Sequence, residues 1–278
     1  MRSPSDYVYD SKPTSVRPVP ILSRNLPAEE TVYQSLVVSS IAMDAKKQPE
    51  GTGGADARYT LHQGDAVDWL RSLATASIDL MITDPPYESL EKYRAVGTTT
   101  RLKRSKASSN DWFAIFPNQR FPEFFAEVHR VLRSNRHFYL FCDAETMFIA
   151  KPLGEAAGFR FWKPLVWDKQ KIGMGYHYRA RYEFILFFEK GRRRLKNLGI
   201  PDVLSASRIR GGYPTEKPVE ICSILVSQST EPGEVVVDPF AGSGAVGVAA
   251  VQQGRRFWGN DTASDSIDLM RQRLQAIA

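Results

Sequence analysis

The stretch that decides the fold of this chain is Val235-Val236-Val237-Asp238-Pro239-Phe240-Ala241-Gly242-Ser243-Gly244, a β-branched run followed by a glycine-rich turn. It predicts a buried strand, a tight turn and the start of a helix. Glycines let the backbone approach a ligand closely, and a helix N-terminus offers free N–H groups. The next predicted strand leads to Asp261, where a doubly wound fold places the acid that binds ribose hydroxyls. Together the two features predict a site for a nucleoside cofactor.

Segments around this turn alternate between strand and helix patterns. Short apolar runs predict strands at residues 59–62, 78–83, 137–142, 161–167, 183–188, 235–237 and 256–259. Apolar residues at helical spacing predict helices at residues 65–73, 121–132, 147–157, 218–227, 244–253 and 265–277. This alternation predicts an α/β fold with a doubly wound, mostly parallel sheet and helices on both of its faces.

A second turn, Asp84-Pro85-Pro86-Tyr87, directly follows the apolar run 78–83. The carboxyl end of such a strand is where α/β folds place ligand chemistry. Two prolines fix φ and remove two N–H donors, so the turn presents a carboxylate and backbone carbonyls in one rigid array. That array suits an NH₂ group, which can donate one hydrogen to Asp84 and the other to the Pro85 carbonyl. Tyr87 offers an aromatic face on which a flat base can stack.

The two turns, in this order, resemble the amino-group DNA methyltransferases with the β-type, permuted motif order, in which an Asp-Pro-Pro-Tyr turn precedes the cofactor loop. The resemblance covers residues 58–278 and implies a sheet of the S-adenosylmethionine-dependent methyltransferase type. It also implies S-adenosylmethionine as the cofactor. The catalytic residues that it implies are Asp84, Pro85, Pro86 and Tyr87.

Two further segments resemble cofactor contacts of the same family. Gly64-Asp65 is similar to its acidic contact to the cofactor adenine. Residues 213–218 are similar to its His-Pro-Thr-Gln-Lys-Pro segment at the methionine end, although Tyr213 and Glu216 depart from that pattern. The cofactor-binding residues implied are Asp65, Ala66, Asp84, Thr215, Lys217, Pro218, Asp238, Pro239, Phe240, Ala241, Gly242, Ser243, Gly244 and Asp261.

The activity implied is methyl transfer from S-adenosylmethionine to the exocyclic N6 of an adenine flipped out of double-stranded DNA. An N4-cytosine product stays open, because the same turn can bind either amino group. An RNA adenine methyltransferase and a nucleic-acid-binding partner subunit without catalysis also stay open, although Tyr87 in place of Trp argues against the RNA enzyme. A protein glutamine methyltransferase is disfavoured, because its cofactor loop would precede its catalytic turn.

Two basic segments are candidates for DNA contact. One lies in the polar stretch 88–120, beside the catalytic turn, and the other lies in residues 191–213. Lysine and arginine in such places can neutralise phosphates. The residues are Lys92, Arg94, Arg101, Lys103, Arg104 and Lys106 in the first segment and Arg192, Arg193 and Arg194 in the second. For the second segment, a solvated surface without DNA is an equal alternative.

Composition narrows the class of protein further. Of 278 residues, 42% are hydrophobic, enough for one sizeable core, and the net charge of +6 favours a polyanionic partner. Two cysteines and four histidines without ligand-like spacing predict neither a disulfide framework nor a metal site. No apolar run reaches membrane-spanning length, and we expect the reducing cytoplasm of a prokaryotic cell, with a phage origin also open.

The chain is expected to divide at residue 58. Residues 1–57, rich in proline and serine, are predicted to form an N-terminal extension that is extended or disordered. Residues 58–278 are predicted to form the methyltransferase domain. The resemblance leaves a homodimer and a cognate restriction endonuclease open as partners.

Overall fold

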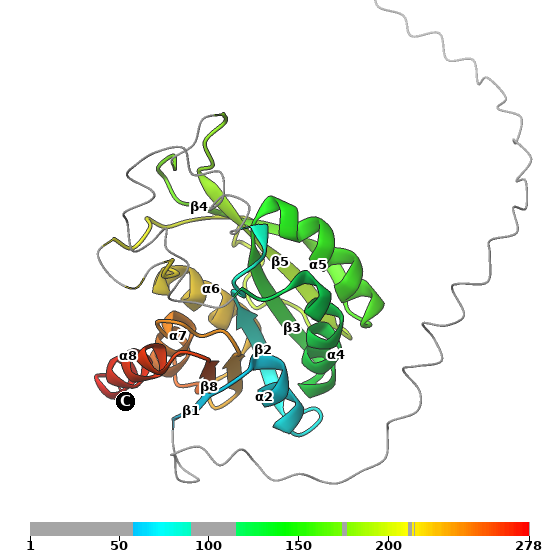
Figure 1. Cartoon of the computed structure of the whole chain (residues 1–278), viewed down its shortest axis with the longest axis vertical. Helices are drawn as coiled ribbons and strands as arrows, with labels where there is room; N and C mark the ends of the chain where they lie inside the picture. Colours follow the sequence, from blue (N-terminus) through cyan, green and yellow to red (C-terminus); the bar gives the residue numbers. More distant parts are fainter. Residues whose placement is uncertain (1–57, 90–114, 174–176, 211–212, 214, 278) are drawn as a thin grey trace, which may run out of the picture. The chain divides into compact units, whose positions relative to one another are not determined.

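One mixed sheet organises the part of the chain that the structure describes (Figure 1). The computed structural model describes residues 58–89, 115–173, 177–210, 213 and 215–277. Across the sheet the strands stand in the order β1-β8-β7-β2-β3-β5-β4-β6. Their bounds are β1 Tyr59–Gln63, β2 Ile78–Thr83, β3 Leu132–Cys142, β4 Arg160–Asp168, β5 Tyr182–Lys190, β6 Val203–Ser205, β7 Val235–Asp238 and β8 Arg256–Asp261. The predicted α/β fold with a mostly parallel sheet is confirmed.

Most strands of this sheet run in the same direction, so the edge formed by their carboxyl ends differs from the edge formed by their amino ends. β1, β8, β7, β2 and β3 pair in parallel, whereas β5 runs antiparallel to both β3 and β4. The carboxyl ends of the parallel strands therefore meet at one edge, where α/β proteins place ligand sites. Because β5 is reversed, its first residues lie at this edge and the residues after it lie at the opposite one.

Helices cover both faces of the sheet (Figure 1). One face carries α2 (Ala66–Ser72), α4 (Phe121–Val131) and α5 (Ala144–Ala156), and the other carries α6 (Val219–Ser229), α7 (Ala245–Gln252) and α8 (Ser264–Gln275). A short 3-10 helix, η2 (Asn118–Arg120), precedes α4. Phe125 and Phe138 belong to the core of the first face, and Val226 and Ala249 to that of the second. Burial on both faces explains why β7 is a continuous apolar run.

The bounds of some elements differ from the prediction for local reasons. The helix α5 begins at Ala144 instead of Met147, because the Asp143 side chain accepts a hydrogen bond from the Thr146 N–H (2.8 Å) and caps the helix. β3 begins at Leu132, directly after α4, instead of at His137. β6 was not predicted; it is three residues long, too short to show a sequence period, and pairs with β4.

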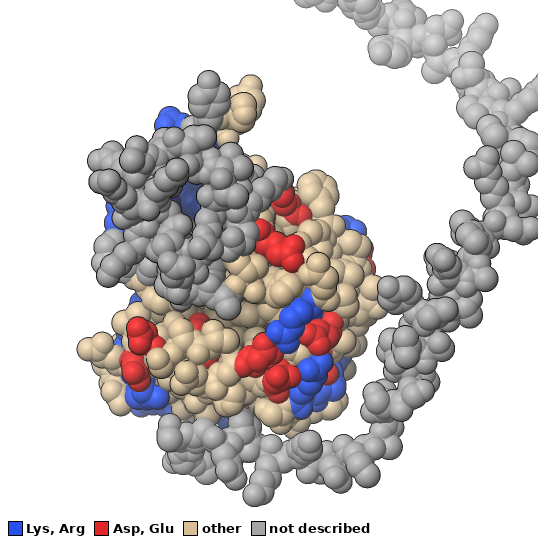
Figure 2. Space-filling model, in the orientation of Figure 1, with Lys and Arg blue, Asp and Glu red and all other residues tan. Residues whose placement is uncertain are grey.

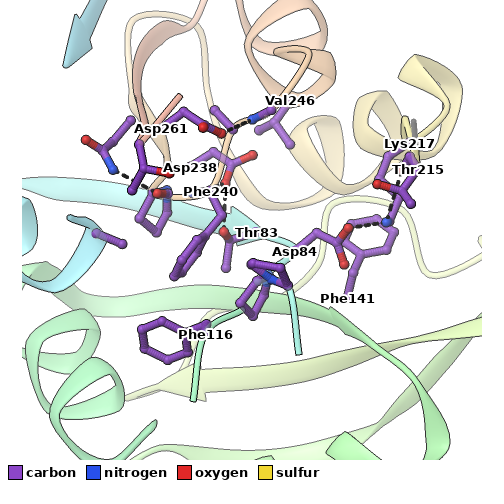
Figure 3. A pocket seen from close by; sticks show the side chains of 18 of the residues that line it. Thr83, Asp84, Phe116, Phe141, Thr215, Lys217, Asp238, Phe240, Val246 and Asp261 are labelled. Carbon is purple, nitrogen blue, oxygen red and sulfur yellow. Dashed lines mark hydrogen bonds and ion pairs between the residues drawn. The ribbon is translucent and has the colours of Figure 1, made fainter. Parts of the chain in front are cut away.

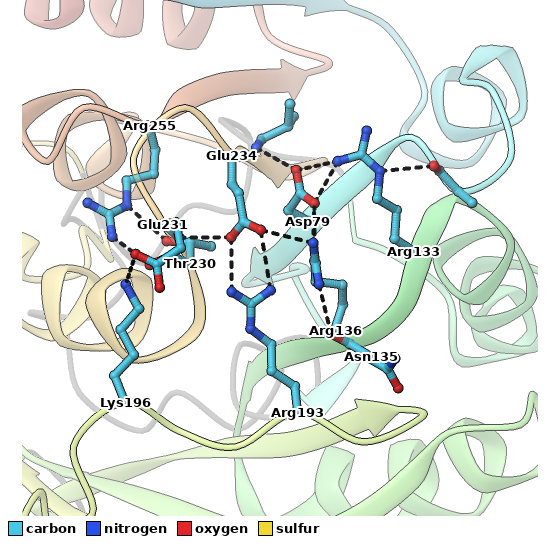
Figure 4. Close-up of polar contacts among 12 residues, drawn as sticks. Asp79, Arg133, Asn135, Arg136, Arg193, Lys196, Thr230, Glu231, Glu234 and Arg255 are labelled. Carbon is cyan, nitrogen blue, oxygen red and sulfur yellow. Dashed lines mark hydrogen bonds and ion pairs between the residues drawn. The ribbon is translucent and has the colours of Figure 1, made fainter.

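A buried ion-pair cluster joins the amino ends of β2, β3 and β7 (Figure 4). Asp79, only 1% exposed, accepts hydrogen bonds from Arg133 (2.6 Å), from Arg136 (2.9 Å) and from the first N–H of β7 (2.9 Å). Glu234 accepts from Arg136 (2.9 Å) and from Arg193 (3.1 Å). Burial opposes the Asp79 charge, but the β7 N–H and the two arginines hold the pKa of that carboxyl below its usual range. The cluster therefore ties three strands together at the edge opposite the expected site.

Acidic and basic side chains are interspersed over α2 and α4 on the face that Figure 2 presents. Arg71 pairs with Asp68 (2.9 Å) and with Glu123 (2.6 Å), and Arg130 pairs with Glu127 (2.7 Å). These pairs neutralise one another, so the outer sides of the two helices do not form a basic surface. Among the described residues, no helix is long and apolar enough to span a membrane.

Several predictions concern residues outside the described ranges. They are the N-terminal extension, residues 1–57, and the basic residues of the first candidate DNA-contacting segment, Lys92, Arg94, Arg101, Lys103, Arg104 and Lys106. These predictions remain untested by the fold.

Candidate active site

A cavity of about 280 Å³ opens at the carboxyl edge of the parallel strands (Figure 3). It is bounded by the ends of β2, β7 and β8, the start of α2, the segment 115–120 and the segment before α6. Of the residues predicted to bind cofactor or to act in catalysis, those lining it are Asp65, Ala66, Asp84, Pro85, Pro86, Tyr87, Thr215, Lys217, Asp238, Pro239, Phe240, Ala241, Gly242, Ser243 and Asp261. Tertiary folding thus brings both turns and the two flanking segments to one place.

The glycine-rich turn has the backbone that its sequence requires. Gly242 and Gly244 have φ values of 50° and 78°, which favour glycine. The Gly242 N–H donates to the Asp261 carboxylate (2.9 Å), which links the turn to the end of β8. A Cβ on Gly242 would lie 3.1 Å from the Tyr213 ring, so the turn is closely covered by the segment before α6. Gly244 does not line the cavity; it precedes α7 and lies against Met270.

Asp238 ends β7 with its carboxylate inside the protein, 4% exposed. Thr83 Oγ1 donates to it (2.7 Å), and so does the Phe240 N–H (3.1 Å). Burial outweighs these two hydrogen bonds and raises the pKa of Asp238 to about 7. A cationic ligand at this end of the cavity would therefore favour the ionised form.

Asn260 is a site residue that the sequence interpretation missed. Its Nδ2 donates to the carbonyls of Gly64 and Pro239, each at 3.0 Å, and its Oδ1 lies 2.7 Å from His62 Nδ1. It thereby joins the end of β1 to the turn after β7. The only signal in the sequence is its position immediately before Asp261.

Asp65 begins the wall formed by α2. It caps that helix by accepting hydrogen bonds from the Val67 and Asp68 N–H groups (3.0 and 3.1 Å). The Arg120 guanidinium donates to both Asp65 carboxylate oxygens (2.6 and 2.9 Å). Arg120 first, and the two backbone donors next, lower the pKa of Asp65 to about 2 against a cost of burial. Arg120, which the sequence did not single out, therefore keeps an ionised carboxylate at the cavity wall.

Two aromatic side chains, Phe116 and Phe240, form part of the cavity wall. Phe116 and Phe240 meet edge to face with their centroids 5.1 Å apart, and the Arg120 guanidinium lies 5.3 Å from the Phe116 centroid. The Phe116 N–H donates to the Pro86 carbonyl (2.7 Å). Phe116 was missed by the sequence interpretation, because nothing local marks it as a neighbour of either turn.

Hydrogen bonds join Glu88 and Asn118, described residues that precede and follow the range 90–114 in the sequence. Glu88, just after the catalytic turn, accepts hydrogen bonds from the Asn118 N–H (2.8 Å) and from Asn118 Nδ2 (2.9 Å). Tyr87 and Phe116 also form a parallel β-bridge. The described residues at both ends of the candidate DNA-contacting stretch 88–120 therefore lie next to the cavity, which Ile115, Phe116, Pro117 and Arg120 help to line.

Asp84 is the carboxylate of the Asp-Pro-Pro-Tyr turn, which the sequence predicts to be catalytic. Lys217 Nζ forms an ion pair with its Oδ2, whereas its Oδ1 is buried and has no hydrogen-bond partner among the described residues (Figure 3). Burial raises the pKa of Asp84 to about 6, with the Lys217 ammonium opposing and the Glu183 carboxylate adding to that rise. Tyr87 lines the same pocket but is only 8% exposed, so little of its ring is open to solvent.

Lys217 reaches the turn from the segment before α6. Its ammonium lies 5.5 Å from the Phe141 centroid and 3.5 Å from Glu183 Oε2, in addition to its contact with Asp84. Burial opposes its charge, but the two carboxylates raise the pKa of Lys217 above its usual range. Pro218, predicted to bind cofactor, does not line the cavity and is instead the N-cap residue of α6.

The basic residues of the second candidate DNA-contacting segment, Arg192, Arg193 and Arg194, lie away from this cavity. Residues 191–194 follow β5 and thus lie at the amino edge of the parallel strands, where Arg193 pairs with Glu234 (Figure 4). That position favours a structural role for Arg193. Phosphate contact by Arg192 and Arg194 remains a prediction without support from the arrangement of the site.

Comparison with known proteins agrees with this geometry. The family model described as DNA methylase, N6_N4_Mtase, matches residues 78–272. YubD of Escherichia coli (strain K12), a methylase by name, is 31% identical over 77% of this chain and 89% of its own length. The DNA adenine methyltransferase YhdJ of the same organism is 28% identical over 80% of this chain and 84% of its own.

A solved structure shares the fold. The crystal structure of an M1.HpyAVI–SAM complex superposes with a TM-score of 0.57 at 21% identity, covering 78% of this chain and 99% of that one. The family match spans both turns, the strands that carry them and the residues that line the cavity, except Asp65 and Ala66. The chain therefore belongs to the N6/N4 DNA methylase family.

Proposed function

We propose that this protein transfers the methyl group of S-adenosylmethionine to N6 of an adenine flipped out of double-stranded DNA. The observation that carries the proposal is the buried Oδ1 of Asp84, which has no hydrogen-bond partner within the described part of the chain and is held in a rigid proline turn at the wall of the cavity. A buried acceptor without a donor is costly, and a substrate amino group would satisfy it.

The cavity suits S-adenosylmethionine along its whole length. The carboxylate of Asp65 and the Phe240 ring, which both line the cavity, fit the adenine end, and Asp261 fits the ribose hydroxyls. The close cover of Gly242 by Tyr213 leaves no room for a side chain in the turn that would lie against the nucleoside. Buried acidic groups such as Asp238 suit a ligand with a positively charged sulfonium. When bound there, S-adenosylmethionine supplies the electrophilic methyl group.

The chain's own part in the reaction follows from the catalytic turn. An exocyclic amino nitrogen is a poor nucleophile, because its lone pair is delocalised into the base. A hydrogen bond from that amino group to Asp84 Oδ1, and a second to the Pro85 carbonyl, would localise the lone pair and stabilise the positive charge that develops. Tyr87 and the walls of the pocket would hold the flipped base flat and in line.

Adenine is the favoured base for two reasons. The Asp-Pro-Pro-Tyr turn resembles that of adenine enzymes more than the serine-containing turns of cytosine enzymes, and YhdJ is an adenine methyltransferase by name. An N4-cytosine product is the second candidate, since the family covers both and the hydrogen bonds at Asp84 would be the same.

The test is nucleoside analysis of methylated DNA. We expect purified protein, S-adenosylmethionine and duplex DNA to yield N6-methyldeoxyadenosine by mass spectrometry, with matched duplex RNA as a parallel substrate. Asp84→Ala should lower the methylation rate by about 100-fold or more, because it removes the acceptor, while cofactor affinity changes little. Asp202→Asn is the control, since that carboxylate is half exposed and pairs with Lys163 outside the cavity. Near-normal turnover of Asp84→Ala would refute the proposal. Detection of N4-methyldeoxycytidine in place of N6-methyldeoxyadenosine would show that the target base is cytosine.

The proposed function also implies macromolecular partners, of which duplex DNA is the first. Duplex DNA would approach beside the contact between Glu88 and Asn118, where the candidate DNA-contacting stretch 88–120 meets the Asp-Pro-Pro-Tyr turn. A homodimer and a cognate restriction endonuclease are further proposals. Size-exclusion chromatography with light scattering tests the first, and cleavage of DNA by the neighbouring gene product tests the second.

A further inference from the structure

Four charged side chains form an alternating chain that ends at the catalytic carboxylate. Lys169 Nζ lies 2.5 Å from Glu183 Oε1, Glu183 Oε2 lies 3.5 Å from Lys217 Nζ, and Lys217 pairs with Asp84 Oδ2. The side chains are 14%, 20%, 9% and 24% exposed in that order, so the chain of charges is largely shielded from water. The segment following β4, the start of β5, the segment before α6 and the end of β2 each supply one member.

The reversed strand β5 is what makes this arrangement possible. Its antiparallel pairing with β4 sets Glu183 opposite Trp167, two residues before Lys169, at the edge where the cavity opens. Lys169 is held in turn by its N–H, which donates to the Arg181 carbonyl (2.8 Å), and its ammonium lies 5.3 Å from the Trp167 ring. Glu183 lines the cavity, whereas Lys169 does not.

The two oxygens of Asp84 are unequal as a result. Oδ2 is occupied by Lys217, and Oδ1 is buried without a hydrogen-bond partner among the described residues. If Lys217 were free to move between the two oxygens, it would compete with a substrate amino group for Oδ1. Glu183 Oε2, 3.5 Å from Lys217 Nζ, provides a second contact that restrains the ammonium.

We propose that Glu183 and Lys169 are positioning residues for amino-group methylation: they hold the Lys217 ammonium on Oδ2 of Asp84 and so reserve Oδ1 for the target amino group. This inference rests on the proposed function. Neither residue touches the reacting atoms; both act through Lys217.

The charges that face Asp84 define at which pH its carboxyl group ionises. Lys217 and Lys169 favour its ionised form, Glu183 disfavours it, and burial disfavours it most. The other titratable groups influenced by its charge are Tyr87 in the same turn, Cys142 at the end of β3, Tyr213 and Cys222 around the segment before α6, and Asp238 at the end of β7. Of these, Asp238 also titrates near neutrality, with a pKa of about 7.

The experiment compares the pH dependence of kcat/KM for matched variants, because kcat/KM reports the groups of the free enzyme. Lys169→Met removes a cation that favours ionised Asp84, so the midpoint of the acidic limb of the kcat/KM profile should rise by about 0.5–1 pH unit. Glu183→Gln removes an anion that disfavours ionised Asp84, so the same midpoint should fall by about 0.5–1 pH unit. The double variant restores the charge balance and should return the limb close to its original midpoint. Lys169→Arg should behave as the parent does.

Two controls separate this effect from general damage. Lys163→Met removes a cation from β4 that pairs with Asp202 at the surface, so it should leave the limb unmoved. Cofactor affinity measured over the same pH range identifies any contribution of Asp238, which lies in the cofactor turn. Thermal unfolding reports whether each variant is folded, and if Lys169→Met is not, Glu183→Gln alone decides.

The outcomes are distinct. Opposite shifts of the two single variants and restoration in the double variant support the positioning role. An active enzyme whose limb is unmoved in Glu183→Gln, or moves in the same direction in both single variants, overturns it while leaving the proposed function intact. If the parent protein methylates no amino group in DNA, the proposed function fails first, and this inference falls with it.

Discussion

Replacing Gly244 with alanine should destabilise the protein through two separable effects. Gly244 has a φ of 78°, a backbone conformation that costs an L-residue about 1–2 kcal/mol. A Cβ built there would lie 2.6 Å from Met270 Cγ, and Met270 is fully buried in α8. Relieving such an overlap in a packed core costs about 1–3 kcal/mol. We therefore expect the free energy of unfolding to fall by about 2–5 kcal/mol.

The chain contains a matched control for the backbone contribution. Gly233 has a φ of 82°, nearly the same as Gly244, but a Cβ there would meet nothing within 4 Å. Gly233→Ala should therefore show the conformational cost alone, about 1–2 kcal/mol. The difference between the two variants, about 1–3 kcal/mol, isolates the contact with Met270.

A double variant tests the contact directly. Met270→Ala by itself should cost about 2–5 kcal/mol, because it leaves a cavity. In Gly244→Ala/Met270→Ala the new methyl group enters that cavity, so the combined loss should fall short of the sum by about 1–3 kcal/mol.

Urea unfolding followed by circular dichroism measures all four free energies, and cofactor affinity of each folded variant shows whether the turn itself has moved. Equal losses for Gly244→Ala and Gly233→Ala would refute the packing argument. So would strict additivity in the double variant, since it would mean that the alanine methyl never met the Met270 side chain.

Three further predictions concern charged groups. The pKa of Asp65 is about 2 when folded, below its ordinary 3.8, so the stability that Arg120 confers is present at neutral pH and is lost as pH falls towards 2. Because both partners are about one-third exposed, Arg120→Met should cost about 1 kcal/mol in urea unfolding at pH 7 and less at pH 2.5; equal losses would contradict this. Asp238, with a pKa of about 7, should release a proton when cationic S-adenosylmethionine binds near pH 7, and affinity should weaken below that pH. Calorimetry in buffers of different ionisation enthalpy measures the release, which Asp238→Asn should abolish. Asp79→Asn should cost about 1–3 kcal/mol, since it removes the buried carboxylate that accepts from Arg133, Arg136 and the first N–H of β7, and a loss below about 0.5 kcal/mol would count against that role.

Local sequence was sufficient for the two turns and the elements that carry them. The run Ile78–Thr83 appears as β2 with the bounds predicted, and the glycine-rich turn joins β7 to α7 as expected. Apolar runs, proline and glycine act through the backbone of their immediate neighbours, so their effect can be inferred without a tertiary model. The order of the turns, with the family resemblance, was enough to predict the cofactor and the chemistry.

The partners of those turns are set by pairings between distant segments. Arg120 binds Asp65, which is 55 residues away in the sequence, and Lys217 pairs with Asp84, which is 133 residues away. Nothing near Phe116 or Glu183 in the chain marks either as a cavity residue. Their positions depend on the register of strands and on how helices pack over the sheet, which are properties of the whole fold.

The direction of β5 had the widest consequences. Its apolar pattern predicted a strand but could not reveal that it runs antiparallel, because inward and outward faces alternate in the same way for either direction. That direction brings Glu183 to the catalytic edge and carries Arg193 to the opposite edge, into the cluster with Glu234. The sequence by itself thus determined the class of fold and predicted the groups that we propose meet the target amine. Only the tertiary structure decided which charges surround them, because those charges come together through long-range strand pairing.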